Sequence, residues 1–371
     1  MALSKVDLAN QVENQLPQNL VANNLPFRNI IINGDMSIAQ RATSVTGVNS
    51  GGYYTCDRWR IGTNLGAFTV SQSTDVPSGQ GFANSFKMDC TTAENTTTAV
   101  DTIALFSQRI EGQNLQYLKK GTSSAESLTA SFWVKSNKTG TYILEMYDTD
   151  NSRTISKSYT IDSASTWEKK TLTFAGDTTG AFGNDNGGSL RFNFWLGAGT
   201  FYSSGTLATS WQTYDNTDRA VGQINLADTV GNELYITGIQ LEAGTTASEF
   251  EFLPYDVNLD RCQRYYQALS NGYRITNLVF SCFGSTDAYG THSFIKTMRT
   301  APSITFNSLG SGNIDAYNNG SQRSLSSISA SNISADRVSI DLVGSGWSGG
   351  QALHLNNDNT SVPLFTASSE L

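Results

Sequence analysis

Strand-like alternation, interrupted by turn signals at intervals of about ten residues, runs through most of residues 27–255. In the segment LTASFWVK at 128–135, every second residue is apolar on one face, and turn-forming stretches follow at NKTG (137–140) and DTDN (148–151). No stretch between consecutive segments is long enough for a helical crossover, so antiparallel pairing is expected. The pattern predicts an all-β fold, with a jelly-roll β-sandwich over residues 29–255.

Trp133 lies on the face opposite Phe132, so this predicted strand is apolar on both sides. One face is expected to pack into the sandwich core. The other is expected to be covered by a loop, a neighbouring subunit or a ligand.

The pattern changes period within LEAGTTASEFEFLPYDVNLDRCQRYYQ at 241–267. Pro254 ends the last strand, and Asp256 can cap a helix by accepting from a free N–H of the first turn. Apolar residues then recur at spacings of three and four: Leu259, Cys262, Tyr266 and Leu269. The spacing predicts a linker helix over 256–272, and renewed alternation over 273–371 predicts a second, smaller β-sandwich domain that is distal to the first.

Charge and hydropathy limit the partners. The 371 residues carry a formal net charge of −8, and Lys119-Lys120 and Lys169-Lys170 are isolated pairs that are interpreted as solvated turn or strand-end residues. Neither nucleic-acid binding nor membrane insertion is predicted, since no basic patch and no run of 18 apolar residues occurs. Residues 1–28 are polar, lack the pattern of a signal peptide and predict an attachment arm on a protein made in a cytoplasm.

No enzyme, cofactor or catalytic metal is predicted. The four cysteines lack zinc-ligand spacing, and Cys56 and Cys90 are expected to be buried free thiols. Neither of the two histidines lies near a nucleophile elbow. A structural calcium ion held by Asp35 and Glu242 is an alternative. A glycosidase pair also stays open among acids whose alternation indicates a solvent face: Glu111, Glu145, Glu233, Glu242, Glu249 and Glu251.

Aromatic side chains in polar loops are the remaining candidates for binding chemistry, because sugar faces stack on such rings while neighbouring polar groups bond hydroxyls. Each also has an interpretation as core, and Trp59 is expected to fill the sandwich interior. The glycan-binding candidates are Tyr53, Tyr54, Trp195 and Trp211 in the larger domain, and Tyr289, His292, Tyr317 and Trp347 in the smaller one. Tyr202 and Tyr214 share the loop setting.

A family resemblance covers the chain from about residue 29 to its end. The segments that carry it are NGDMSIAQR, YYTCDRWRIG, SFWVKSNKTGTYILEMYD, STWEKKTLTFAGDTTG, LRFNFWLGAG, the stretch AVGQINLADTVGNELYITGIQLEAGTTASEFEFLPYDVNLDRCQRYYQ, MRTAPSITF and TASSEL. Together they resemble tail-fibre and related virion proteins of phages that infect aquatic bacteria. The middle region is similar to the carbohydrate-binding jelly rolls of polysaccharide-degrading enzymes.

The resemblance implies a non-enzymatic virion fibre, assembled in the host cytoplasm as a homotrimer. It implies attachment to other virion proteins through the N-terminal arm and recognition of host polysaccharide or lipopolysaccharide at the far end. The arm is short and lacks long fibrous repeats, which leaves attachment to tail, neck or capsid open. Two alternatives remain: a structural decoration without receptor binding, and a polysaccharide depolymerase.

Overall fold

The computed structural model describes residues 27–95, 100–269, 278–307, 309, 314–318, 321–357 and 363–371. The chain divides after Pro254 into two compact units, each described here by itself. Most of the predicted arm (1–28) and the end of the predicted linker (270–272) lie outside the described residues. No described helix is long and apolar enough to cross a membrane.

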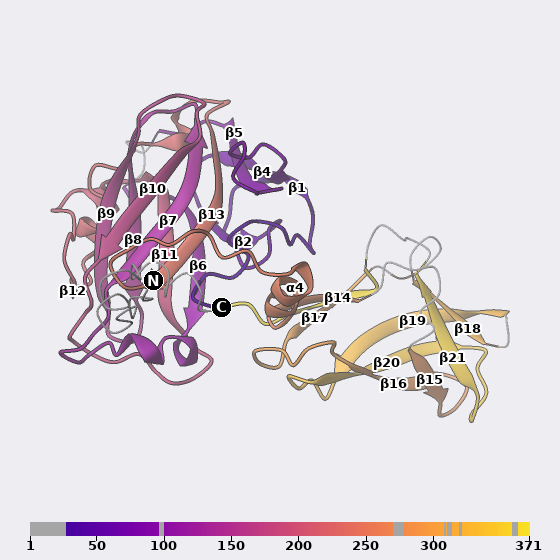
Figure 1. Ribbon diagram of the computed structural model, residues 1–371. Coiled ribbons are helices and arrows are strands. Elements are labelled where there is room, and N and C mark those ends of the chain that lie inside the picture. The colour runs from indigo at the N-terminus through magenta and orange to yellow at the C-terminus, as the bar shows by residue number, and fades with distance from the viewer. Residues whose placement is uncertain are drawn as a thin grey trace, which may run out of the picture. The chain divides into compact units, whose positions relative to one another are not determined.

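The first unit contains two antiparallel sheets, which are shown in Figure 1. The first sheet has the order β1 (Ser44–Val48), β4 (Ala67–Ser73), β5 (Ser85–Thr92), β13 (Glu233–Ala243), β7 (Leu128–Ser136) and β10 (Glu168–Phe174). The second has the order β12 (Gln212–Thr213), β9 (Arg153–Ile161), β8 (Gly140–Asp148), β11 (Gly188–Ala198), β6 (Ile103–Glu111), β3 (Arg60–Thr63) and β2 (Gly52–Tyr53). The chain passes repeatedly from one sheet to the other, as in jelly rolls.

Aromatic rings from the two sheets meet in the core. The rings of Phe86 on β5 and Phe106 on β6 stack at 4.3 Å, and Phe132 on β7 meets Phe194 on β11 edge-on at 5.0 Å. Trp59 is 1% exposed and stacks on Phe106 at 4.4 Å, as expected for a residue of the sandwich interior. This core confirms the predicted all-β sandwich.

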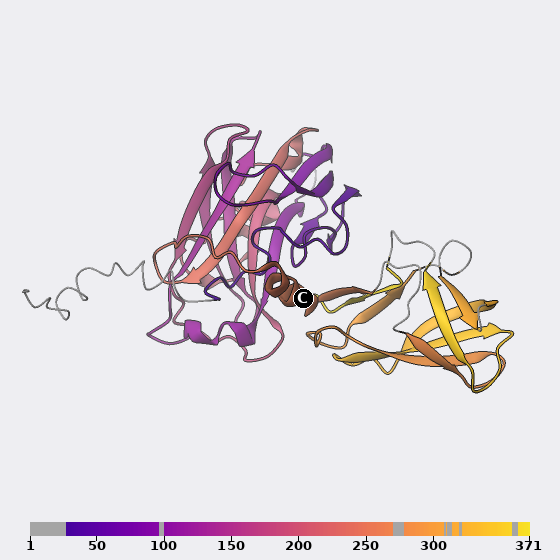
Figure 2. The same ribbon diagram turned by 45° about the vertical axis from the view of Figure 1, so that its right-hand side comes forward.

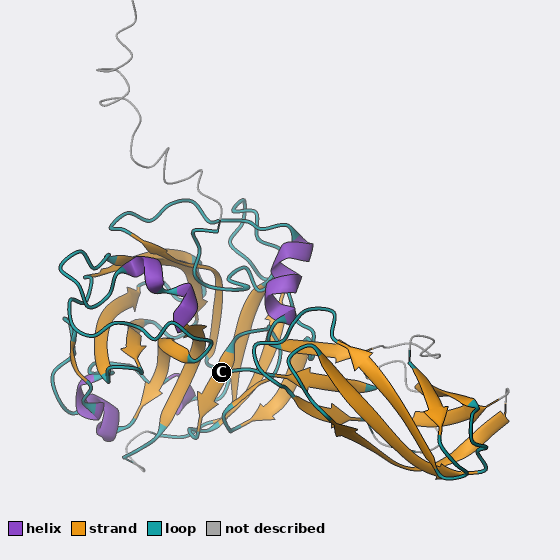
Figure 3. Ribbon diagram, turned by 90° about the horizontal axis from the view of Figure 1, so that it is seen from below, coloured by secondary structure: helices purple, strands orange, loops and turns teal. Residues whose placement is uncertain are grey.

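Short helical turns occupy the connections of this unit, which Figure 3 colours purple. They are η1 (Gly112–Asn114), η2 (Gln116–Leu118), α3 (Thr200–Ser203), η3 (Asn216–Asp218) and η4 (Leu226–Asp228). Asp215 and Asn225 precede η3 and η4, and each side chain accepts a hydrogen bond from a backbone N–H of the turn.

The second unit contains a closed barrel with the strand order β15 (Val279–Cys282), β16 (Asp287–Ser293), β20 (Arg337–Ser345), β19 (Ser321–Ser331), β18 (Ile314–Asn318) and β21 (Ala352–Asn357). A separate three-stranded sheet has the order β14 (Tyr266–Leu269), β22 (Phe365–Ser368) and β17 (Ser303–Phe306). Figure 2 shows both. The sequence predicted a small sandwich here; the pairing that closes a barrel is a long-range property that alternation does not reveal.

The predicted linker helix is shorter than expected. Helix α4 covers Tyr255–Gln263 and belongs to the second unit, with Asp256 inside its first turn rather than before it. Tyr266–Leu269, predicted as the end of the helix, form strand β14 instead and pair with Phe365–Ser368. The physical reason is a partner strand about a hundred residues away, whose hydrogen bonds outweigh a local helical spacing.

Candidate functional site

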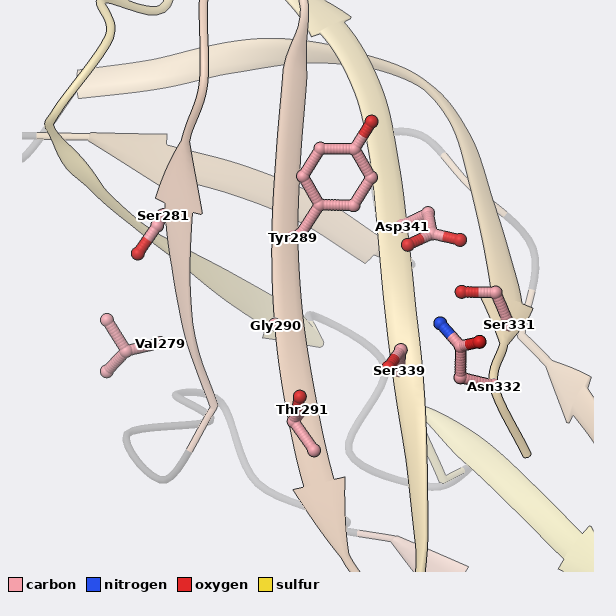
Figure 4. A pocket seen from close by; sticks show the side chains of 9 residues that line it. All are labelled: Val279, Ser281, Tyr289, Gly290, Thr291, Ser331, Asn332, Ser339 and Asp341. Atoms are coloured by element: carbon pink, nitrogen blue, oxygen red, sulfur yellow. The ribbon is translucent and has the colours of Figure 1, made fainter. Parts of the chain in front are cut away.

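A polar hollow of about 530 Å³ lies on the outer face of the barrel in the second unit, where strands β15, β16, β20 and β19 run side by side (Figure 4). Its lining consists mainly of hydroxyl, amide and carboxylate side chains around one aromatic ring. The lining residues are Val279, Ser281, Tyr289, Gly290, Thr291, Ser331, Asn332, Ser339 and Asp341.

Strand alternation places these side chains together. On β16, Ala288 packs in the core while Tyr289 and Thr291 are exposed. The register then sets Tyr289 opposite Ser281 on one side and Asp341 on the other, and Figure 4 shows the Tyr289 ring standing between these two neighbours. Directly opposite side chains on one face lie about 5 Å apart, within reach of one small ligand.

The hollow offers both stacking and hydrogen bonding. Tyr289 is 45% exposed, and the 74% exposed Phe283 meets its ring edge-on at 5.1 Å. Among the described residues, no side-chain hydrogen bond engages Asp341, Ser339 or Thr291. Sugar-binding sites use three kinds of group: a carboxylate that accepts hydrogen bonds, hydroxyls that both donate and accept them, and an exposed aromatic ring on which the sugar stacks.

Two further candidates in the second unit, His292 and Tyr317, are less accessible than Tyr289. His292, on β16, faces the opposite way from Tyr289; its half-buried ring lies 5.4 Å from Phe365, and burial lowers the pKa of His292. Tyr317 is half-buried on β18, opposite His354. Neither residue lines the hollow.

Two tryptophan candidates are interior. Trp347 is 4% exposed within the barrel core. Trp195 is fully buried, and its indole N–H donates to Glu145 Oε2 at 3.0 Å. Neither ring is open to a ligand in this structure, which supports a packing role for both.

The remaining candidates are half-buried in the first unit. The Arg41 guanidinium carbon lies 5.4 Å from the centre of the Tyr53 ring, and the Tyr54 hydroxyl donates to Ser50 O at 3.0 Å. The Trp211 indole N–H donates to Ala175 O at 2.7 Å. None of these three rings lines the hollow on the barrel.

The face of Trp133 that is opposite to the core borders a second hollow, of about 230 Å³, on the first unit. Loop residues Phe82, Phe250 and Phe252 line it, and each ring pair among them lies within 5.1 Å. Of the three expected covers for this face, a loop, a neighbouring subunit or a ligand, the structure shows loop residues beside Trp133.

Asp341, Asn332 and Phe283 were not among the residues predicted from the sequence. Alternation in RVSIDLVGS indicates that Asp341 faces outward, but only the register shows that it lies beside Tyr289. Asn332 follows β19 with a positive φ of 44°, a conformation that asparagine adopts more readily than most residues.

Three of the acids interpreted as solvent-facing are buried instead: Glu111, Glu145 and Glu242. Burial alone would raise the pKa of Glu145, but the charge and hydrogen bonds of Arg219 outweigh it and hold this pKa below its usual value. The Glu242 carboxylate accepts from Ser248 and lies 3.8 Å from Arg28 Nε, so its surroundings do not fit the calcium site considered with Asp35. Among the described residues, no group of three or more His, Cys, Asp or Glu side chains is arranged to hold a metal.

All four cysteines are free and buried, as expected for Cys56 and Cys90. Burial raises the pKa of the Cys56 thiol, with the charge of Asp57 adding to the effect. A thiol kept protonated in this way is a poor nucleophile.

No protein family profile and no curated relative matches the chain. Among solved structures, the chain is similar to the enzymatically active domain of tailspike protein 4 of bacteriophage CBA120, at 16% identity over 59% of this chain and 22% of that one (TM-score 0.31). It is also similar to the family 11 carbohydrate-binding module of a cellulosomal cellulase of Clostridium thermocellum, at 11% identity over 58% and 96% (TM-score 0.26). A third is TmCBM61 in complex with β-1,4-galactotriose, at 10% identity over 58% and 99% (TM-score 0.29). The chain thus spans less than a quarter of the tailspike chain.

Proposed function

We propose that the protein binds glycans through the hollow on the barrel and serves a phage as a virion fibre protein. The observation that carries the binding proposal is the grouping of an exposed ring, Tyr289, with the carboxylate of Asp341 and the hydroxyls of Thr291 and Ser339. Their side chains lack hydrogen-bond partners among the described residues, so a ligand's hydroxyls can take those places without breaking an internal bond.

The same lining supports binding without cleavage. Glycoside hydrolysis uses two carboxylates that face each other across the scissile bond. Of the nine described residues that line the hollow, Asp341 alone carries a carboxylate. The proposal is therefore a non-enzymatic receptor.

The fibre role rests on the resemblance of the sequence to virion proteins and includes assembly as a homotrimer. A three-fold assembly gives a use to exposed apolar side chains such as Phe252, which is 51% exposed. Light scattering of the purified protein at micromolar concentration is expected to give the mass of three chains. The mass of one chain would remove the trimer from the proposal and leave glycan binding standing.

An array of neutral and acidic bacterial surface polysaccharides tests glycan binding. The full chain is expected to bind at least one neutral polysaccharide, and Tyr289→Ala is expected to weaken that binding about tenfold, because a stacked ring contributes roughly 1–2 kcal/mol. Asp341→Asn keeps the shape of the hollow and tests the contribution of the charge.

Tyr255→Ala is the matched control, since this tyrosine is 65% exposed in the same unit and does not line the hollow. Equal weakening by both variants would show that the hollow is not the binding site. New reducing ends in the bound polysaccharide would favour the depolymerase instead.

A further inference from the structure

Three arginines gather on the outer face of the second sheet of the sandwich, in the first unit. Arg60 lies on β3, Arg109 on β6 and Arg191 on β11, three strands that are neighbours in the sheet. The residues that follow them, Ile61, Ile110 and Phe192, belong to the sandwich core. Because side chains alternate along a strand, the three arginines face away from that core.

The register brings like charges together. Arg109 and Arg191 are directly opposite each other, and Arg60 is opposite Ser107, two residues before Arg109. Like charges directly opposite on a sheet destabilise it. The opposed pair of Arg109 and Arg191 therefore does not stabilise the fold by itself. The chain has more acidic than basic residues, so a shortage of acids does not explain the grouping.

Within the described part of the chain, acidic side chains do not neutralise these arginines. No ion pair engages Arg60, Arg109 or Arg191 among the described residues. Glu145, which lies on β8 two residues before Tyr147, accepts from Arg219 with both carboxylate oxygens, at 2.7 and 2.9 Å. Glu111, two residues beyond Arg109, is fully buried and accepts from Gln113 Nε2 at 2.6 Å.

Partial burial makes the positive charge of the three arginines more costly. All three arginines are half-buried. The pKa values of Arg109 and Arg191 are both lowered, and burial is the largest cause. The positive charges of Arg60 and Arg58 lower the pKa of Arg109 further. The charge of Arg109 does the same to the pKa of Arg191. These cations have lost hydration without gaining an anionic partner from the residues that the structure describes, and an incoming anion would relieve that cost.

Aromatic rings continue the surface beside the arginines. Tyr147 on β8 is directly opposite Arg191, whose guanidinium carbon lies 5.4 Å from the centre of the ring. The Tyr214 ring lies 4.4 Å from that of Tyr147, and both are half-buried. This face therefore combines guanidinium groups, which donate hydrogen bonds, with two neighbouring tyrosine rings.

We infer that this face, which we call the arginine face (Arg60, Arg109, Arg191, Tyr147 and Tyr214), binds an acidic polysaccharide through the carboxylate, sulfate or phosphate group of one sugar residue. A guanidinium donates two parallel hydrogen bonds to such an oxyanion, and the tyrosines can pack against the sugar ring. The inference shares with the proposed function the premise that the ligand is a glycan, but it concerns a different site on a different unit.

A nucleic acid is the less favoured occupant. Its affinity comes from many phosphate contacts along a basic track. Here the unpaired cations form one compact group, on a chain with a net charge of −8. Single-stranded DNA is therefore included in the test as a competing ligand.

The test measures retardation of the full chain in native gels that contain polygalacturonate, dextran sulfate or neutral dextran. The wild type is expected to bind one or both acidic polymers and not neutral dextran. Arg109→Gln/Arg191→Gln is expected to weaken that binding tenfold or more, since two charge-assisted contacts are lost. Binding of only one polymer identifies carboxylate or sulfate as the preferred group.

The matched control is Lys169→Gln/Arg337→Gln, which removes two exposed charges elsewhere. It is expected to leave binding within about twofold. The arginine double variant is also expected to melt at the same or a higher temperature than the wild type, because a like-charge pair is gone.

Three results would overturn the inference: no retardation of the wild type by either acidic polymer, equal losses in the two double variants, or tighter binding of a single-stranded DNA oligonucleotide than of both polymers. The test is independent of the proposed hollow. Tyr289→Ala is expected to leave acidic-polymer binding unchanged, so failure of either site can be told from failure of the other.

Discussion

Lys119 and Lys120 are adjacent in the sequence and lie in opposite environments. The Lys119 side chain is 54% exposed and pairs with Glu126, as expected for a solvated turn residue. Lys120 was expected to be solvated too, but it is buried, and its ammonium lies 2.6 Å from Asp148 Oδ2 and 3.0 Å from Asp177 Oδ2. A lysine pair in a sequence does not reveal which member faces a buried pair of acids.

Replacing Lys120 by methionine should be strongly destabilising. Its removal leaves two buried carboxylates without their ammonium partner, which costs about 3–5 kcal/mol of unfolding free energy. Lys119→Met removes an exposed pair and should cost at most about 0.5 kcal/mol. Urea unfolding of the two variants measures the difference, and similar values for both would contradict the role assigned to Lys120.

The buried pair of Glu145 and Arg219 makes stability depend on pH in a defined direction. The pKa of Glu145 in the folded protein lies below its usual value, so its contribution is complete above the unfolded pKa of about 4.3 and is lost as pH falls through the lower, folded value. Glu145→Gln should therefore lower the melting temperature at pH 7, and the gap to the wild type should shrink below about pH 4. A gap that widens on acidification would contradict this sign.

At the scale of elements, strand β13 shows how one glycine allows a bend. Pairing of β13 with β7 slips between Thr237 and Gln240, and Gly238, inside this bulge, has a φ of +61°. An added Cβ would lie 2.6 Å from the Phe82 ring, which lines the smaller hollow beside Trp133.

Gly238→Ala should destabilise the first unit by about 2–4 kcal/mol, which combines a left-handed backbone cost of about 1 kcal/mol with overpacking of about 1–3 kcal/mol. Gly231→Ala is the control: its φ is +85°, but nothing lies within 4 Å of an added Cβ, so it should lose only about 1 kcal/mol. Thermal unfolding separates the two costs. Equal losses would mean that Phe82 moves aside freely.

Local patterns predict elements better than they predict pairing. Alternation in residues 128–135 predicts strand β7, and the strand-like end of the chain is β22. Tyr266–Leu269 has helical spacing yet pairs with β22, because distant hydrogen bonds decide between two locally acceptable conformations. Trp195, on β11, and Trp347, in the loop after β20, could not be told from ligand-binding rings, since a local pattern does not show which other residues bury a ring.

At the scale of the whole molecule, both proposed sites arise from residues that sequence order keeps apart. Tyr289 and Asp341 meet through the pairing of β16 and β20, and Arg109 and Arg191 through that of β6 and β11. From the sequence pattern alone, each arginine is predicted to be an ordinary solvent-facing residue of an alternating strand. Composition and alternation therefore predicted an all-β chain with exposed aromatic side chains, while the sites required the register.

Binding to whole cells shows directly whether this chain recognises surface glycans. Fluorescently labelled full chain is incubated with a panel of aquatic bacterial strains before and after periodate oxidation, which destroys vicinal hydroxyls of sugars. At least one strain is expected to retain the protein, and oxidation is expected to remove most of this retention. Tyr289→Ala is expected to lower the retention, while Tyr255→Ala is not. Retention that survives oxidation and is the same for both variants would rule out glycan recognition by the hollow.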